Sequence, residues 1–586
     1  MNYTLNTNSS SSQKTSAITA IKKLWPLISE EKPIIIIALA AVILNSLVNL
    51  TAPRLIAHAI DTFIPAKNYH GVLVYAGFIL LMYLGGLLTS YAQTRLMGGV
   101  GQRVLFRLRN SIFTKIQELP VAFFNQNKAG DLISRINNDT DKINQFFSQS
   151  LIQFMGSIFL MLGAGVFLLS INLKLGSATL APALLLLIFT RAISPWVKRK
   201  NLTSMQTLGG MSGEIQESLN NFKVIIAFNR RDYFKQKFNE VNENNYKASI
   251  SSGIANNTFT PIYGLSSNLG QLIVLAFGIY LISTGQFTIG LLISFLSYAN
   301  SFYNPLRQLA ALWASLQAAL ASWDRVHDIL VLESNLNTIP DAGKKDSNSI
   351  LKFQDVNFKY PDGKEVLHHI NLELEKGKTY ALVGPTGGGK TTTASLMARL
   401  YDATSGIVFL DGKDIRSYQN TERTKKIGFI LQEPFLFSGS VRENILYGNE
   451  QYKNYSNEQL ENVINNAGLE TLLTRFDSGL DTKLSSSGDA VSLGQKQLIA
   501  FIRAVLRSPD ILILDEATAN IDTVTESLLE EILNKLPPST TKVIIAHRLN
   551  TIANSDEILF INAGQVTKAG SMENAIDMLL HGKRKS

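Results

Sequence analysis

The sequence predicts two kinds of structure in one chain: six α-helices that cross a membrane, with long cytoplasmic helical extensions, followed by an α/β domain. Three observations predict this arrangement. Only 17% of the 586 residues are charged, against about 25% in ordinary soluble proteins. Six long apolar stretches occupy the first half of the chain. In the second half, short apolar runs alternate with helical patterns.

Each apolar stretch is near or above the ~18 to 20 residues that a helix needs to cross a hydrocarbon core. The stretches cover residues 33–52, 71–90, 151–170, 175–193, 261–284 and 287–312. One such stretch alone could be a buried helix of a large soluble protein. Six together, nearly free of charge, indicate a six-helix membrane domain over residues 33–325.

The positive charges, which give a net charge of +9, predict the orientation of these helices. Lys and Arg cluster before the first stretch, after the second and after the fourth, whereas the opposite loops hold only Arg54, Lys67 and Lys174. Positive loops are retained in the cytoplasm. We therefore predict a multi-pass protein of the cytoplasmic membrane with both termini in the cytoplasm. Residues 1–32 are expected to be a mobile cytoplasmic tail, not a signal peptide.

Two cytoplasmic loops, residues 97–148 and 198–247, are too long to be plain connectors. The first has helical spacing, interrupted at Pro120 and again at residues 128–130. The second has the same design, with NFKVIIAFNRRDYF at its tip. We expect two helical hairpins that extend the membrane helices and bear on another domain. The alternative is a solvated charged face.

The composition changes in the second half. Residues 326–349 are predicted to be a linker, because they include a polar stretch with Pro340 and Gly343. The runs TYALV (379–383), IGFIL (427–431), ILILD (511–515) and KVIIA (542–546) are typical of buried parallel strands with crossover helices. Residues 350–586 should therefore form one α/β domain. The chain has no Cys, which excludes disulfides, thiol catalysis and thiolate metal sites.

A phosphate-binding motif follows the first of these runs. GPTGGGKT, residues 384–391, fits G-x-x-x-x-G-K-[ST] and precedes a helical pattern. Glycines let backbone N–H groups turn toward phosphate oxygens, Lys390 can reach the β and γ phosphates, and the Thr391 hydroxyl suits Mg²⁺. The fold class is thus a helical membrane domain followed by an α/β P-loop nucleotide-binding domain, with ATP and Mg²⁺ as cofactors.

An acidic motif, ILILDEATANID, covers residues 511–522. Asp515 ends an apolar strand pattern, where its carboxylate can hold Mg²⁺. Glu516 can orient or deprotonate an attacking water. His547 follows the run at 542–546 and is predicted to contact the γ-phosphate or Glu516. An Asp–Glu pair alone could be a helix cap, but next to a P-loop it indicates a hydrolysis site.

Together these motifs resemble those of ATP-binding cassette (ABC) exporter half-transporters, and the likeness covers nearly the whole chain. Its most diagnostic text is VSLGQKQLIAFIRAVLRSPDILILDEATANID, residues 491–522, which is similar to the signature loop and the strand that follows it. The resemblance implies that two such chains pair head to tail. The signature of one chain, Ser492, Leu493, Gly494 and Gln495, then covers ATP on the partner's P-loop.

The resemblance implies further roles. Tyr360 would stack on adenine, Gln432 would touch Mg²⁺ or the attacking water, and Asp522 would lie at the dimer interface. The implied nucleotide-binding set is Tyr360, Gly384, Pro385, Thr386, Gly387, Gly388, Gly389, Lys390, Thr391, Thr392 and Asp515. The implied catalytic set is Glu516, His547 and Gln432, and the Mg²⁺ ligands are Thr391, Gln432 and Asp515. The two hairpins would be coupling segments.

The signature departs from the family pattern Leu-Ser-Gly-Gly-Gln, because Leu493 stands where a Gly lets the backbone approach phosphate. Leu adds volume and restricts φ at this contact. The other motifs are intact, so a heterodimer with a second half-transporter is favoured over a homodimer.

The expected function is ATP-driven export or flipping of a hydrophobic or amphiphilic substrate by alternating access. A small molecule, a lipid or a peptide all remain open as cargo, since Asn45, Asn49, Asn268, Gln271 and Asn300 either line a cavity or join helices. The alternatives are a homodimeric lipid or peptide exporter, an ATP-gated channel and a sensor. Nucleic-acid binding is disfavoured, because the basic residues lie beside membrane stretches.

Overall fold

The computed structural model describes residues 3–5, 25–26, 29–341, 343, 348–361, 363–432, 434–484, 491–515, 523–546 and 552–581. The chain forms two compact units, which are described separately. The helical unit comprises Asn6–Ile116 and Gly130–Val331. The α/β unit comprises Met1–Leu5, Gln117–Ala129 and Leu332–Ser586, so that two segments from the first half of the sequence join the second.

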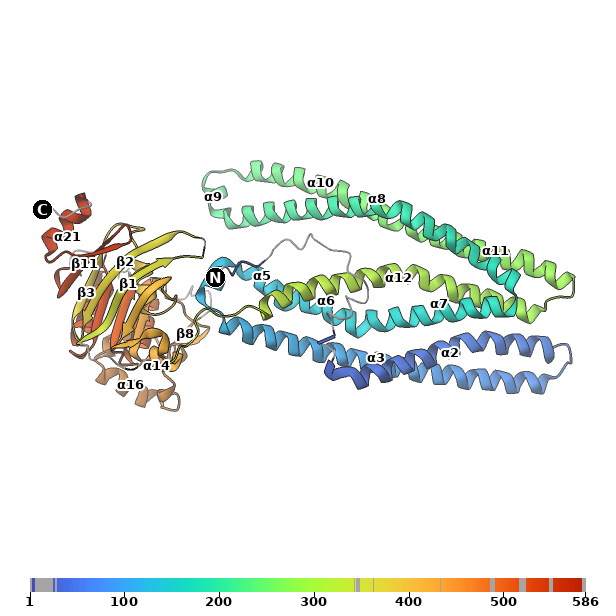
Figure 1. The fold of residues 1–586 in the computed structure, drawn as a ribbon, viewed down its shortest axis with the longest axis horizontal. Helices are drawn as coiled ribbons and strands as arrows, with labels where there is room; N and C mark the ends of the chain where they lie inside the picture. The colour runs from blue at the N-terminus through green and yellow to red at the C-terminus, as the bar shows by residue number, and fades with distance from the viewer. Residues whose placement is uncertain are drawn as a thin grey trace. The chain divides into compact units, whose positions relative to one another are not determined.

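Long antiparallel helices make up the helical unit (Figure 1). Its α-helices are α2 (Lys32–Thr62), α3 (Tyr69–Glu118), α5 (Ala129–Ser134), α6 (Thr140–Gln145), α7 (Leu151–Ile171), α8 (Leu173–Asn220), α9 (Phe222–Ala227), α10 (Arg231–Asn257), α11 (Phe259–Ser283) and α12 (Ile289–Leu330). A short 3₁₀ turn, η1 (Ser29–Glu31), precedes α2, and two π-helical turns, η2 (Arg135–Asp139) and η3 (Phe146–Ser150), flank α6.

The predicted membrane stretches all lie within helices: α2, α3, α7, α8, α11 and α12. Among the described residues, five helical segments are long and apolar enough to cross a membrane. The sixth stretch lies in α12, which is not among the five. Polar residues such as Asn300, Asn304 and Gln308 dilute its apolar face. The helical membrane fold is confirmed, and the count of six spans stays a prediction.

Contacts of α12 with α2, α7 and α8 hold the apolar core of this unit together. The Tyr298 hydroxyl of α12 donates to the Leu50 carbonyl of α2 at 2.7 Å, and the Tyr303 hydroxyl donates to the Thr179 carbonyl of α8 at the same distance. The Tyr298 ring also stacks on Phe167 of α7. Conversely, large apolar side chains such as those of Leu81 and Ile188 are about two-thirds exposed, as expected for a surface that faces lipid.

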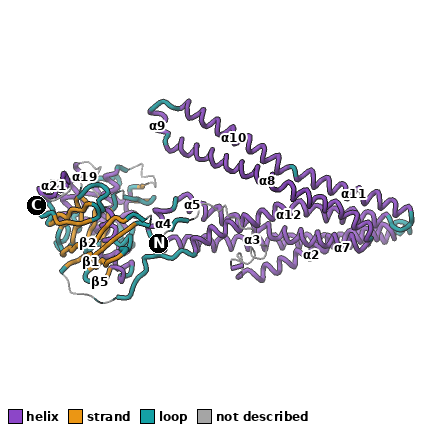
Figure 2. Tube along the Cα trace, turned by 45° about the horizontal axis from the view of Figure 1, so that its top comes forward, coloured by secondary structure: helices purple, strands orange, loops and turns teal. Residues whose placement is uncertain are grey.

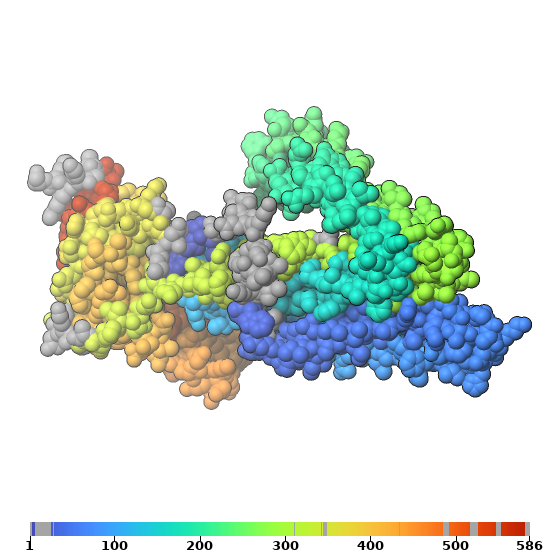
Figure 3. Space-filling view, turned by 45° about the vertical axis from the view of Figure 1, so that its right-hand side comes forward, coloured from blue at the N-terminus to red at the C-terminus, as the bar shows by residue number. Residues whose placement is uncertain are grey.

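Both predicted hairpin interruptions are present. α3 ends at Glu118, a separate short helix α4 (Val121–Gln126) follows Pro120, and α5 begins at Ala129. In the second hairpin, α9 forms the tip between α8 and α10 (Figure 2). The space-filling view shows this α8–α10 hairpin standing clear of the rest of the helical unit (Figure 3). Its apolar tip residues Phe222, Val224 and Phe228 are more than half exposed.

A buried ionic cluster joins the α5–α6 region to α12. The fully buried Arg135 donates to Asp131 at 2.8 Å and to the Arg325 carbonyl at 2.5 Å. Arg325 in turn pairs with Asp131 at 2.7 Å and with Asp139 at 3.3 Å. A buried charge is tolerated only when it is paired in this way, so the cluster fixes the register between the two helical segments.

The α/β unit contains two main sheets within its described residues. The strands are β1 (Ser349–Lys359), β2 (Glu365–Glu375), β3 (Thr379–Val383), β4 (Ser405–Leu410), β5 (Lys413–Asp414), β6 (Ile427–Ile430), β7 (Gly439–Ser440), β8 (Lys483–Leu484), β9 (Ile511–Asp515), β10 (Thr541–Ile545), β11 (Glu557–Asn562) and β12 (Gln565–Lys568). One sheet is antiparallel with the order β2-β1-β4-β5, and the other has the order β12-β11-β3-β10-β9-β6.

The second sheet is parallel except at its β12 edge. The four predicted strands are β3, β6, β9 and β10, within one residue at each end. The helices are α13 (Lys390–Met397), α14 (Asn420–Lys426), α15 (Val441–Leu446), α16 (Asn457–Asn466), α17 (Glu470–Leu473), α18 (Leu493–Val505), α19 (Thr523–Lys535) and α21 (Met572–His581). One apolar core joins the two sheets and α13, and a second packs α15–α19 on β6 and β9.

The structure departs from two predicted boundaries. α12 continues to Leu330, so that the first residues of the predicted linker 326–349 are helical. Within the predicted tail 1–32, Tyr3 and Leu5 are buried and contribute to the α/β unit. The extension of α12 follows the helical spacing of the buried Trp323, Val326 and Ile329. The burial of Tyr3 and Leu5 has no signal in the local sequence, because it depends on contacts with distant segments.

The ionic cluster yields a stability prediction. Arg135→Leu removes the fully buried cation of the cluster with its bonds to Asp131 and the Arg325 carbonyl, at a cost of about 2–3 kcal/mol, since Asp131 keeps its pair with Arg325. We expect a clear drop in the temperature at which purified protein loses its monodisperse peak on heating. Lys247→Leu is the control, because it removes an exposed pair with Glu243 worth about 0–1 kcal/mol. Equal shifts in the two variants would contradict the prediction.

Candidate functional site

The phosphate loop, residues 384–389, connects β3 to α13 and is built around glycines. Gly384 has φ +153°, and a Cβ there would lie 1.9 Å from the Ile561 carbonyl oxygen. Gly389 has φ +113°, and a Cβ there would lie 2.8 Å from Leu367. Both positions therefore require glycine. The loop ends at the N-terminus of α13, where backbone N–H groups favour an anion.

Two side chains at the start of α13 occupy defined positions. The largely buried Lys390 donates its Nζ to the carbonyls of Gly384 and Pro385, at 2.8 and 3.1 Å, so that the side chain lies along the loop. The Thr391 hydroxyl lies 3.3 Å from Oδ1 of Asp515, the last residue of β9. The structure thus brings Thr391, next to the phosphate loop, close to Asp515, which lies 124 residues further along the chain. Both were predicted to be Mg²⁺ ligands.

Gln432 follows β6, which pairs with β9 in parallel register. Its carbonyl accepts a hydrogen bond from Nε2 of Gln497 at 3.2 Å, and Gln497 is buried on α18. Further along α18, Arg503 donates to the carbonyls of Phe435 and Asn444. Burial lowers the pKa of the Arg503 guanidinium. The segment after β6 is therefore fixed to the helix that begins with the signature.

Tyr360 lies directly after β1, next to α13. Its hydroxyl is 3.0 Å from that of Thr392, and its ring meets the rings of Phe358 and Tyr401 edge-on, at 4.9 and 5.4 Å between centroids. Tyr360 and Tyr401 also line a pocket of about 490 Å³. Tyr360, which was predicted to stack on adenine, therefore lies next to α13, the helix that follows the phosphate loop. No P-loop residue lines that pocket.

The signature forms the start of α18. The Ser492 hydroxyl accepts from the Gln495 N–H at 3.2 Å, and Oε1 of Gln495 accepts from the Ser492 N–H at 2.8 Å, which is a capping box. Leu493 is 39% exposed. Nε2 of Gln495 also donates to the Arg475 carbonyl at 2.7 Å. Within the described residues, none of these contacts joins the signature to the P-loop of the same chain.

Three predicted residues, Glu516, Asp522 and His547, lie outside the described residues. Two residues that the sequence did not single out are Tyr401 and Gln497, which contact Tyr360 and Gln432. These contacts join residues that are 41 and 65 positions apart in sequence. No motif includes Tyr401, and the signature text that includes Gln497 gives no sign of its contact with Gln432. The Ser492–Gln495 capping box, by contrast, follows the S-x-x-Q spacing and was readable from the sequence.

Comparison with known proteins agrees with this geometry. The family model "ABC transporter transmembrane region" matches residues 35–306, and the model "ABC transporter" matches residues 367–519. The chain is 32% identical to an uncharacterized ABC transporter ATP-binding protein of Bacillus subtilis, over 95% of this chain and 92% of that protein.

Two further relatives carry more specific names. The chain is 33% identical to a fatty acid ABC transporter ATP-binding/permease protein of Mycobacterium bovis, over 84% of this chain and 77% of that protein. It is 30% identical to a multidrug resistance ABC transporter ATP-binding and permease protein of Lactococcus lactis, over 94% of this chain and 93% of that protein.

A membrane-spanning helical domain fused to a P-loop ATP-binding domain defines an ATPase coupled to transmembrane transport. The chain belongs to the ABC transporter family, as an exporter half-transporter. It binds ATP, is a multi-pass membrane protein, and drives export as part of a dimer in the lipid bilayer.

Proposed function

We propose that this half-transporter exports or flips an amphiphilic substrate by alternating access, and that Glu516 carries ATP hydrolysis. The observation that supports this most directly is the 3.3 Å approach of Thr391 to Asp515. It sets a phosphate loop and an acidic strand end side by side, at the edge of the sheet where Glu516 follows in sequence. Glu516 would orient and deprotonate the attacking water.

Mg²⁺ fits the donor atoms at this edge. A threonine hydroxyl and a carboxylate are the hard oxygen ligands that Mg²⁺ prefers. Thr391 and Asp515 would hold the ion, with Gln432 as a further ligand from the neighbouring strand end. The bound ion would neutralise charge on the β and γ phosphates. Lys390 would leave its loop carbonyls to reach the same phosphates, and His547 would contact the γ-phosphate.

Transport requires that the closing of two ATP-binding domains reach the membrane helices. We assign α4 and α9 as the two coupling segments, at the side that the distribution of Lys and Arg predicts to be cytoplasmic. The exposed apolar tip of the α8–α10 hairpin supports this assignment, because Phe222, Val224 and Phe228 need a covering surface. A partner chain's ATP-binding domain would supply that surface. Asp522 would lie at the interface between the two domains.

The signature supports a heterodimer in preference to a homodimer. Leu493 presents an exposed isobutyl group at the N-terminus of α18, where the partner's ATP would approach. This group blocks close backbone contact with phosphate. We propose that ATP on this chain's P-loop is hydrolysed against the partner's signature, whereas this chain's signature covers a slower site.

The membrane cavity supports an amphiphile whose polar end is uncharged. A pocket of about 250 Å³ between α2, α3, α7 and α12 is lined by side chains of which none is charged. Six of them are carboxamides: Asn45, Asn49, Gln93, Gln153, Asn304 and Gln308. Oε1 of Gln93 is buried without a hydrogen-bond partner in the described structure. Since an unsatisfied amide is costly in an apolar medium, the pocket favours a hydrogen-bonding ligand.

This pocket distinguishes between the substrates in the relatives' names. A fatty acid carries a carboxylate, which is best stabilised by a cation when it leaves water, and no Lys, Arg or His lines this pocket. A neutral amide or hydroxyl group matches the carboxamide lining directly. We therefore infer a neutral amphiphile, closer in chemistry to multidrug cargo than to a fatty acid.

The first prediction from the proposed function tests ATP hydrolysis and assembly with a second chain together. The tagged chain is purified from its native host under mild conditions, and its co-purifying proteins and ATPase activity are measured before and after Glu516→Gln. We expect a stoichiometric second ABC chain, and loss of most activity on substitution. Brisk activity from a preparation of this chain alone would contradict the heterodimer. Activity unchanged by Glu516→Gln would contradict the catalytic assignment.

The second prediction concerns Mg²⁺. Thr391→Val keeps the shape of the side chain and removes the hydroxyl that faces Asp515. We expect binding of ATP to lose its dependence on Mg²⁺, measured by titration with a fluorescent ATP analogue with and without EDTA. Thr393→Val is the control, because its hydroxyl bonds the carbonyl of Gly389, directly before α13, and not Asp515. A wild-type Mg²⁺ response in Thr391→Val would exclude this ligand.

The third prediction concerns the cavity. In nanodiscs without nucleotide, 1-monolauroylglycerol should bind more tightly than laurate. Asn45→Leu/Asn304→Leu should weaken its binding about tenfold, the factor for one or two lost hydrogen bonds. Gln271→Leu/Asn300→Leu is the matched control, because these carboxamides bond each other at 2.8 Å outside the pocket. Tighter binding of laurate, or equal effects of both double variants, would contradict the inference.

A further inference from the structure

Residues 3–5 occupy a position that the family motifs do not account for. Tyr3 and Leu5 are only 2% and 5% exposed. Their contacts are with Gln126 and Asn127, at the end of α4, and with residues 333–335, after α12. These three segments are more than 100 residues apart in sequence, and all belong to the α/β unit. We call this set of contacts the clasp.

One side of the clasp binds the end of α4. The Tyr3 N–H donates to Oε1 of Gln126 at 2.7 Å, Nδ2 of Asn127 donates to the Tyr3 carbonyl at 2.9 Å, and the Leu5 N–H donates to Oδ1 of Asn127 at 3.0 Å. Nδ2 of Asn127 also reaches the Phe123 carbonyl within α4, at 2.8 Å. Two carboxamides thus bind alternate residues of an extended segment, as a neighbouring strand would.

The other side of the clasp binds the linker. The Tyr3 hydroxyl lies 3.1 Å from the Glu333 carbonyl and 3.0 Å from Oδ1 of Asn335, and it accepts from the Asn335 N–H at 2.9 Å. Burial raises the pKa of this hydroxyl, so it remains protonated and able to donate at neutral pH. Tyr3 therefore joins the end of α4, through its backbone, to the chain that leaves α12, through its hydroxyl.

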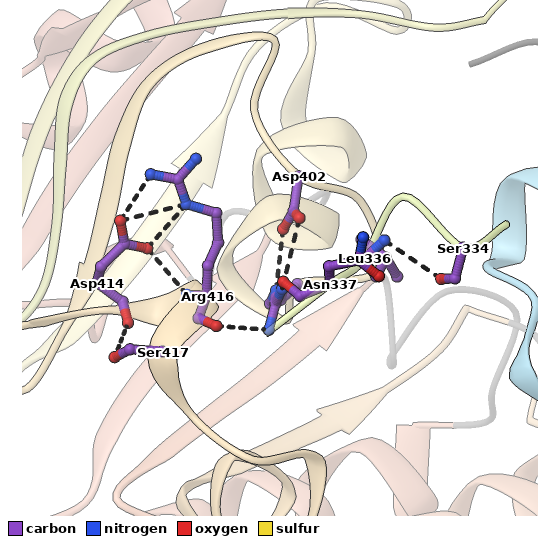
Figure 4. A network of polar contacts seen from close by, with 8 residues as sticks. Ser334, Leu336, Asn337, Asp402, Asp414, Arg416 and Ser417 are labelled. Carbon is purple, nitrogen blue, oxygen red and sulfur yellow. Dashed lines mark hydrogen bonds and ion pairs between the residues drawn. The ribbon is translucent and has the colours of Figure 1, made fainter. Parts of the chain in front are cut away.

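The same linker is held from the ATP-binding domain. Asn337, two residues after Asn335, accepts at its carbonyl from Arg399 at 2.8 Å. Arg399 is 1% exposed, follows α13, and pairs with Asp402 at 2.9 Å. Its guanidinium also approaches the Arg416 carbonyl. Figure 4 shows Asn337, Asp402 and Arg416 converging on this point. The linker is thus hydrogen-bonded to Tyr3 at Asn335 and to Arg399, just after α13, at Asn337.

A second connection runs from α4 to the predicted adenine residue. Nδ2 of Asn125 donates to the Tyr401 hydroxyl at 2.8 Å, and the Tyr401 ring packs edge-on against Tyr360. Ala122 of α4 and Asn335 of the linker line the same pocket as these two tyrosines. The clasp therefore borders the site where the base of ATP is expected.

We propose that Tyr3 is a positioning residue, which holds α4 against the ATP-binding domain so that nucleotide binding near Tyr360 and movement of the membrane helices stay linked. The physical reason is the shortness of α4. It has six residues between interruptions at Pro120 and Asn127, and a helix of this length is unstable without external contacts. The inference rests on the proposed roles of Tyr360 and α4. It adds Tyr3, near the start of the chain, to the residues that link the ATP-binding domain to the membrane helices.

The experiment uses the full chain, with its partner, in nanodiscs. Tyr3→Phe keeps the ring and removes only the hydroxyl, whereas Tyr3→Ala removes both. Amide hydrogen exchange should be about fivefold faster at Asn335 in Tyr3→Phe, because its N–H loses the Tyr3 hydroxyl as acceptor. Exchange of residues 121–127, which the Tyr3 backbone binds, should also become faster as residues 3–5 loosen. Both changes should be larger in Tyr3→Ala. Tyr455→Phe is the control, because this half-exposed tyrosine lies outside the clasp.

ATP turnover, with and without 1-monolauroylglycerol, separates positioning from a merely structural role. We expect basal turnover to stay near that of the unaltered protein in Tyr3→Phe, while stimulation by the amphiphile falls. Unchanged exchange in α4 would overturn the proposal, and so would faster exchange with full stimulation. Absence of turnover in the unaltered protein would instead contradict the proposed function, because exchange in α4 reports on the clasp without any activity.

Discussion

The structure depends first on a constraint of solvent: hydrocarbon cannot bond backbone N–H and C=O groups, so each segment inside it must satisfy them internally. The first half of the chain meets this constraint with helices, and these helices do not stop at the membrane. α3 and α8 run for 50 and 48 residues, roughly 75 Å at 1.5 Å per residue. Membrane and cytoplasmic parts therefore belong to one continuous helix in each case, which allows movement at one end to reach the other.

A parallel sheet solves a different problem in the α/β unit. Parallel strands place their carboxyl ends at one edge, so loops distant in sequence meet there. β3 delivers the phosphate loop to this edge, β9 delivers Asp515, and β6 delivers Gln432. The 3.3 Å approach of Thr391 to Asp515 follows from that topology. The pairing of Gln497 with the Gln432 carbonyl then connects this edge to α18 and the signature.

Within the α/β unit, polar contacts join segments that are far apart in sequence. Asn125 meets Tyr401, Arg399 meets the linker, and Tyr3 meets both α4 and the linker. Directional bonds of this kind specify one arrangement while contributing modest net stability. They suit a surface that must keep its register through a cycle of movement. Arg135 has the corresponding role inside the helical unit, where its burial makes pairing obligatory.

The sequence by itself determined the helical and α/β halves, the strands β3, β6, β9 and β10, and the P-loop, because these follow from local periodicity and short motifs. It also located the breaks at Pro120 and around α9. Tertiary structure alone decided which distant residues meet. Tyr3 lies in a stretch that reads as a polar tail, Tyr401 belongs to no motif, and the signature text around Gln497 does not indicate its partner. Their roles arise from contacts over 41 to more than 300 residues, and local sequence carries no signal for such contacts.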